Sequence, residues 1–100
     1  MLSVFMKPYL ELSDIFQEKS LDQKMIDLAS RFKAYRKKAK LTQLQLSDRS
    51  GVPYGTIKRF ERTGKISLDS LWMLTMAVGC DDQLEQLFSS PPLTADDLRG

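Results

Sequence analysis

The sequence predicts an all-α domain of five helices, preceded by an N-terminal extension and followed by a short tail. Three observations support this prediction. Apolar residues recur at steps of three and four along several segments, which is the spacing of one helix face. Ser or Thr stands where these helices would begin, and Gly stands where several would end. A short strand is expected only at residues 3–6, where Pro8 would end it.

Length and composition narrow the possibilities further. The chain has 100 residues, which suits one domain, and its 42% hydrophobic and 28% charged content is typical of soluble globular proteins. It has one cysteine, Cys80, and no histidine, so it lacks an internal disulfide, the commonest general base and the commonest zinc ligand. No apolar run approaches the ~20 residues of a membrane span. We therefore expect no catalytic residue, no metal site and no cofactor, and a cytoplasmic protein without a membrane partner.

The chain divides into an extension at residues 1–19, a helical domain at 20–88 and a tail at 89–100. The extension has weak helical spacing at residues 10–17. Ser20 is expected to cap the first helix of the domain, with Gln23 reaching back as in a capping box. One apolar stripe of this helix is expected to face the core. It comprises Leu21, Met25, Leu28, Phe32, Tyr35 and Ala39.

The second and third helices lie close together in the sequence. Thr42 with Gln45 repeats the capping signature for a helix that runs to about Ser50, with Leu46 facing inward. Gly51 would allow the sharp turn that follows, because glycine tolerates a positive φ. Pro53 suits the first position of the third helix, where its missing N–H costs nothing. Ile57 and Phe60 would form the apolar back of this helix, and Gly64 would end it.

The last two helices follow the same rules. Ser67 is expected to cap the fourth helix and Gly79 to close it. Asp81 and Asp82 would begin the fifth helix, where negative charge suits the helix dipole, and residues 89–92 would stop it. The expected inward residues of the fourth helix are Leu68, Leu71, Trp72, Leu74, Thr75 and Val78, and those of the fifth are Leu84, Leu87 and Phe88.

Charge is unevenly distributed along the chain. Residues 31–65 carry eleven Lys or Arg against two Asp or Glu, a net charge of +9. Residues 1–30 have a net charge of −2 and residues 66–100 a net charge of −5, which gives the overall +2. A basic middle between acidic ends is typical of a protein that binds a polyanion, although a single run such as residues 36–38 is equally compatible with a solvated helix face.

The second and third helices, joined by a tight turn, have the features of a DNA-binding helix-turn-helix. In such a pair the second helix lies in the major groove with its N-terminal side chains at base edges. The turn has Gly51, and the third helix has an apolar back. Its front is basic and carries Lys58, Arg59 and Arg62.

The residues of this segment also resemble a known family. The runs 41–47, 51–53 and 56–64 are similar to the lambda-repressor-like (Xre-type) helix-turn-helix family, over about residues 31–88. Residues 58–68, followed by Leu74 and by Gly79-Cys80, further resemble HipB-type antitoxin repressors, which accompany HipA-like kinase toxins.

This resemblance implies roles for individual residues. Gln43 would hold a phosphate and brace the third helix, and Thr56 would touch a phosphate. Arg36 and Glu61 would form an ion pair between the first and third helices, although composition alone places Arg36 on the basic surface. The DNA-binding residues expected overall are Thr42, Gln43, Pro53, Tyr54, Gly55, Thr56, Lys58, Arg59, Arg62, Lys65, Lys37 and Lys38.

Alternatives stay open at several of these positions. Arg59 would contact guanine or clamp a phosphate, and Tyr54 would pack on a thymine methyl or sugar or cap its own helix. Four further cations would either contact phosphates or remain solvated: Lys37, Lys38, Arg62 and Lys65. Only phosphate contacts would give DNA binding a steep salt dependence. Two positions depart from the family: Pro53 replaces the usual capping Ser or Thr, and Gly55 has no side chain for base readout.

A domain of this kind reads few base pairs, so a homodimer on two half-sites is expected. Leu44, Met73 and Met76 lie off the inward stripes and would form a protein interface, unless the N-terminal extension covers them. The tail would bind a basic toxin surface or remain unstructured.

The sequence thus favours a dimeric, sequence-specific DNA-binding repressor, in its narrower form the autoregulating antitoxin of a HipA-like module. The alternative is a protein-interaction module that binds a protein partner with little DNA specificity.

Overall fold

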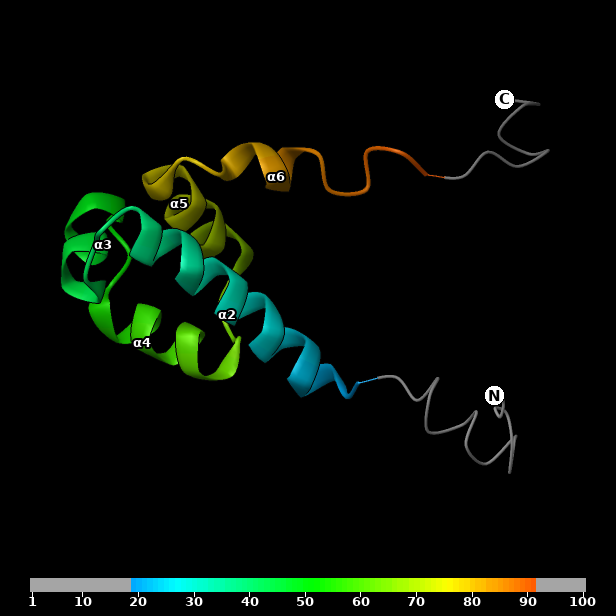
Figure 1. Cartoon of the computed structure of the whole chain (residues 1–100), viewed down its shortest axis with the longest axis horizontal. Helices are drawn as coiled ribbons and strands as arrows, with labels where there is room; N and C mark the ends of the chain where they lie inside the picture. Colours follow the sequence, from blue (N-terminus) through cyan, green and yellow to red (C-terminus); the bar gives the residue numbers. More distant parts are fainter. Residues whose placement is uncertain (1–18, 92–100) are drawn as a thin grey trace.

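The computed structural model describes residues 19–91, and this range folds into five α-helices without a strand (Figure 1). The all-α prediction is therefore confirmed. The strand expected at residues 3–6 and the helix expected at 10–17 lie outside the described residues, as does most of the tail. The five helices are α2 (Leu21–Lys38), α3 (Gln43–Ser50), α4 (Tyr54–Thr63), α5 (Leu68–Val78) and α6 (Asp81–Glu85).

The three helix starts predicted from Ser and Thr caps are confirmed. The Ser20 hydroxyl accepts a hydrogen bond from the Gln23 N–H, and the Ser67 hydroxyl accepts one from the Ser70 N–H. Thr42 and Gln45 form both bonds of a capping box. The box expected at Ser20 is incomplete, because the Gln23 side chain donates to Asp27 Oδ1 instead of reaching back.

The core lies where α2, α4 and α5 meet, with α3 closing it from one end (Figure 1). At its centre the rings of Phe32 on α2 and Phe60 on α4 pack with centroids 5.7 Å apart. Full burial of one such side chain contributes about 1.5–3 kcal/mol relative to exposure. The buried core residues are Ala29, Phe32, Leu46, Val52, Ile57, Phe60 and Leu74.

The apolar stripe expected on α2 is partly wrong. The face of α2 that enters the core carries Ala29, Phe32 and Arg36. Leu28 and Tyr35 are 43% and 40% exposed, and Leu21 is 71% exposed. Because α2 packs mainly against α4, its buried face is rotated away from these residues, and the short helix α6 leaves them partly uncovered.

Three smaller expectations also need correction. Pro53 is the N-cap of α4 and not its first helical residue, and it makes no side-chain capping bond. Leu68 is 65% exposed, since it occupies the outer side of the first turn of α5. Helix α6 ends at Glu85, so Leu87 and Phe88 lie beyond it and are exposed instead of buried.

Within residues 19–91, no helix is both long enough and apolar enough for a membrane crossing.

Candidate nucleic-acid interface

The turn between α3 and α4 is fixed by local hydrogen bonds. Gly51 has φ 80°, the left-handed conformation that glycine adopts without steric cost, and its N–H donates to Ser47 O. The Ser47 hydroxyl donates to Val52 O at 2.7 Å, and Val52 N–H donates to the Ser50 hydroxyl at 3.1 Å. Val52 is itself buried in the core. These bonds hold α4 at one angle to α3, as a helix-turn-helix requires.

The back of α4 is anchored in the middle of the helix and at its C-terminal end. Ile57 and Phe60 are fully buried. At the C-terminal end, Gly64 has φ 79° and is buried against the backbone of Met25 on α2. A Cβ at Gly64 would lie 2.4 Å from the Met25 carbonyl carbon and oxygen. The helix therefore cannot rotate about its axis without disrupting the core, and the direction of its front is set.

The front of α4 is polar, basic and exposed. Residues 55, 59 and 62 follow helical steps of four and three, so they share one face, with Lys58 beside them. Together with Gln43 at the start of α3, they line a shallow hollow of about 400 Å³. Three of its five lining residues are cationic, and none is acidic. The lining residues are Gln43, Gly55, Lys58, Arg59 and Arg62.

Two details shape this surface. A Cβ at Gly55 would meet nothing within 4 Å, so the backbone of α4 is open to close approach by a ligand. Lys58 Nζ lies 5.3 Å from the centroid of the Tyr54 ring, a cation–π contact within the helix. Tyr54 is 39% exposed. The pair therefore presents a cation and an aromatic ring side by side at the N-terminal end of α4.

A buried ion pair ties the helix-turn-helix to α2. Arg36 Nε donates to Glu61 Oε2 at 2.7 Å and Arg36 Nη2 donates to Glu61 Oε1 at 2.8 Å. Arg36 Nη1 donates to Leu41 O, and Gln43 Nε2 donates to Glu61 Oε1 at 3.0 Å. The two charged side chains are only 9% and 3% exposed. Glu61 is thereby neutralised inside the protein, and α4 presents cations alone on its front.

The pair expected from the family resemblance is thus present, and Arg36 does not belong to the basic surface. Gln43 braces α4 through Glu61, as expected, and its contact with a phosphate stays a prediction. The remaining expected DNA-binding residues do not line the α4 hollow. Thr42 and Pro53 are N-cap residues, and Thr56 is half-buried in the first turn of α4. Lys37 and Lys38 are exposed at the end of α2, and Lys65 is exposed just beyond α4.

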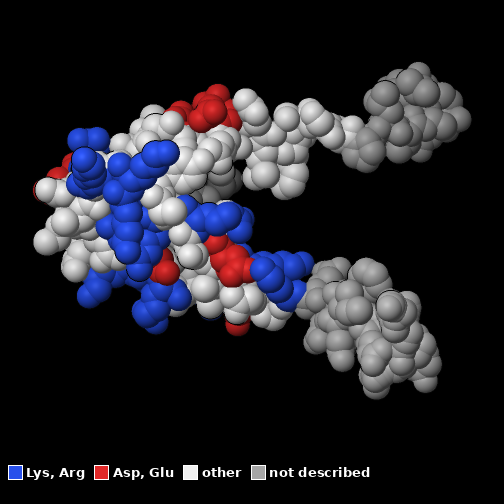
Figure 2. Space-filling model, in the orientation of Figure 1, with Lys and Arg blue, Asp and Glu red and all other residues white. Residues whose placement is uncertain are grey.

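The distribution of charge on one face of the molecule agrees with this arrangement. Figure 2 shows Lys and Arg side chains gathered over the end of the molecule formed by α3 and α4 and over α2, and a group of acidic side chains near α6. Basic side chains concentrated at the end formed by α3 and α4 would orient the domain toward a polyanion.

The three residues expected at a protein interface are exposed, at 60% for Leu44, 40% for Met73 and 61% for Met76. The two methionines and Ala77 of α5 line one hollow together with Arg49 and Ser50 of α3. Leu44, on α3, does not line that hollow.

Sequence reasoning missed one feature, a cleft between α2 and α6. Its walls include Arg31, Tyr35 and Cys80. Burial raises the pKa of the Cys80 thiol, and Asp82 and Asp81 raise it further, so the thiol stays neutral near pH 7. No periodicity marked this cleft, because it depends on how far α6 extends over α2.

The fixed turn, the anchored back of α4 and its cationic front define a DNA-binding helix-turn-helix domain of the kind found in transcription regulators. A family model described as helix-turn-helix matches residues 32–83, just over half of the chain. The chain belongs to this family, the lambda-repressor-like class that the sequence resembles. No curated protein was found to match the sequence.

Proposed function

We propose that this domain is a dimeric repressor that binds double-stranded DNA with sequence specificity through α4. The observation that carries the proposal is the front of α4, where Lys58, Arg59 and Arg62 surround the open backbone at Gly55. A helix approaching base edges needs such a front, because side chains read bases only where the backbone comes close. Arg59 is the base-reading residue in this proposal, with a bidentate contact to guanine.

Fluorescence anisotropy tests this proposal with the DNA upstream of the protein's own gene and a scrambled duplex, each at two salt concentrations. A preference of about 10³ or more for the upstream duplex supports a specific autoregulator. Equal, salt-sensitive binding to both duplexes would show that only the charge acts on this DNA. Absence of binding to either duplex at low salt would refute the DNA proposal and favour a protein-interaction module.

The proposed dimer uses Met73 and Met76 on α5. Both are exposed apolar side chains that line one hollow, and a symmetric contact between two copies would bury them. Analytical ultracentrifugation tests this proposal with the wild type, Met76→Glu and a control, Lys65→Glu, that lies outside the hollow. We expect a dimer that Met76→Glu dissociates and Lys65→Glu does not. A wild-type monomer at micromolar concentration would overturn the assignment.

We further propose that the protein is the antitoxin of a HipA-like kinase. The resemblance of residues 58–68 to HipB-type repressors supports this narrower proposal. Asp81 and Asp82 of α6 would allow a basic partner to bind without blocking α4, because the two helices lie at different ends of the domain (Figure 1). Isothermal titration with a purified HipA-like kinase from the same genome tests it. Saturable binding supports the proposal, and no heat of binding with an active kinase would contradict it.

A further inference from the structure

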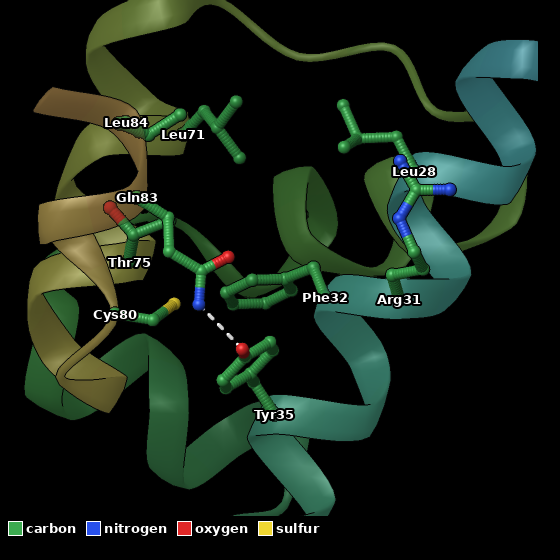
Figure 3. Close-up of a pocket in the computed structure, with 9 residues that line it drawn as sticks. All are labelled: Leu28, Arg31, Phe32, Tyr35, Leu71, Thr75, Cys80, Gln83 and Leu84. Carbon is green, nitrogen blue, oxygen red and sulfur yellow. Dashed lines mark hydrogen bonds between the residues drawn. The ribbon is translucent and has the colours of Figure 1, made fainter. Parts of the chain in front are cut away.

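The cleft between α2 and α6 is a second recess in the domain, away from the front of α4. Figure 3 shows its nine lining side chains around an open space, with Leu28 and Arg31 on one side and Leu71 and Leu84 on the other. Helix α6 packs on α5, and a hydrogen bond from Gln83 to the Tyr35 hydroxyl spans the cleft to α2. No side chain within residues 19–91 therefore covers the apolar surface of this cleft.

The size of the cleft limits what could fill it. Its volume is about 220 Å³, with far more apolar than polar lining surface. Dry cavities of about 150 Å³ accept a single benzene ring, whereas sites for drug-sized ligands have volumes of at least ~300 Å³. The cleft thus suits one ring, or a branched aliphatic group of similar bulk, with one short polar substituent.

The polar groups of the cleft select the charge of that substituent. Arg31 is the only charged residue among the nine that line it. Asp27, one turn earlier on α2, accepts hydrogen bonds from Lys19 Nζ and Gln23 Nε2. The charge of Arg31 makes only the smallest of the contributions that lower the pKa of Asp27, and within residues 19–91 no carboxylate forms a close ion pair with Arg31. Tyr35 accepts the bond from Gln83, which leaves its own O–H able to donate. A guanidinium and a phenol O–H on one helix face favour an anion.

We propose that this cleft binds a small monocarboxylate with a single aromatic ring or a branched apolar group. The ring would lie between Phe32, Leu71 and Leu84, and the carboxylate would meet the guanidinium of Arg31, a pairing that planar bidentate geometry favours. Such a ligand would cover Leu28 and link α2 to α6. The proposal does not depend on DNA binding, since no residue of the α4 hollow takes part.

Two-dimensional ¹H–¹⁵N NMR of the full chain tests the proposal with benzoate, benzyl alcohol and benzylammonium as probes. We expect saturable shifts with benzoate at the amides of Leu28, Tyr35, Leu71 and Gln83, weaker binding of benzyl alcohol and none of benzylammonium. Arg31→Gln should raise the Kd of benzoate by about tenfold, because it removes the charged partner. The control Arg49→Gln, an exposed arginine of α3, should leave this Kd unchanged.

A second variant, Leu28→Trp, fills the cleft from its exposed rim and should abolish the benzoate shifts while the spectrum stays folded. Equal affinities for benzoate in the wild type and Arg31→Gln would overturn the proposal. Benzoate shifts confined to the α4 hollow, or none at millimolar benzoate, would overturn it too. Nuclear Overhauser contacts from Leu28 to residues outside 19–91 would show that another part of the chain fills the cleft, with the same consequence.

Discussion

Arg36 and Glu61 form two parallel hydrogen bonds, of 2.7 and 2.8 Å, across the contact between α2 and α4. They lie 25 residues apart in sequence, and both side chains are nearly inaccessible to solvent. Gln43, at the start of α3, donates a hydrogen bond to the same carboxylate, so the ion pair is connected to a third helix. The pair therefore fixes the helix-turn-helix to the rest of the domain from a position that is closed to solvent.

Removal of Arg36 should destabilise the domain strongly. Arg36→Ala leaves Glu61 as a buried carboxylate without its cation, which typically costs about 3–5 kcal/mol in the free energy of unfolding. Urea denaturation monitored by circular dichroism measures this loss. Arg62→Ala, an exposed arginine of the same domain, is the control and should change stability by no more than about 0.5 kcal/mol. Similar losses in both variants would show that the pair contributes no more than a surface charge.

Comparison of Gly64 with Gly79 separates the backbone strain that a Cβ causes at a positive φ from the steric clash that it causes with a neighbouring helix. Both have φ 79°, but a Cβ at Gly64 would clash with the Met25 backbone, and one at Gly79 would meet nothing within 4 Å. Gly79→Ala should therefore cost about 1–2 kcal/mol from the backbone conformation alone. Gly64→Ala should cost clearly more, because two packed backbones must separate. Thermal unfolding compares the two variants, and equal melting temperatures would contradict the close packing of α4 on α2.

Arg59 and Lys38 should differ in how their loss affects DNA binding. Arg59→Ala should reduce the preference for operator DNA by about 1–3 kcal/mol, because it removes a base contact. Lys38→Ala, at the end of α2, should weaken binding to all duplexes alike and lower the salt dependence by about one counterion. Anisotropy titrations with operator and scrambled DNA measure both effects. If both variants lost only non-specific affinity, Arg59 would be a phosphate contact.

Asp27 should make folding sensitive to acid. Hydrogen bonds from Lys19 and Gln23 lower the pKa of Asp27 below its ordinary value of 3.8. Since the folded state holds the proton less tightly than the unfolded state, this contribution is complete above about pH 5 and is lost as the pH falls through 3.8 toward the lowered pKa of the folded state. Carboxyl ¹³C NMR titration measures the pKa. Lys19→Gln should raise it toward 3.8, and an unchanged pKa in this variant would rule out the Lys19 contact.

The sequence by itself determined the local features of this domain. The caps at Ser20, Thr42 and Ser67 and the left-handed ends at Gly51, Gly64 and Gly79 depend on interactions within a few residues, so residue type and spacing predict them. The two faces of α4 were predictable for the same reason, because a short helix with Ile57 and Phe60 on one side has only one way to bury them.

Only the tertiary structure decided which parts of these helices are covered. Leu28 and Tyr35 had the spacing of core residues, but α2 turns Ala29 and Phe32 toward α4 and leaves the other two at the cleft. The residues alone placed Arg36 on the basic surface, and its burial required Glu61 to arrive from a distant helix, a pairing that only the family resemblance implied. Burial depends on neighbours far apart in sequence, and periodicity within one helix carries no information about how far a neighbouring helix extends.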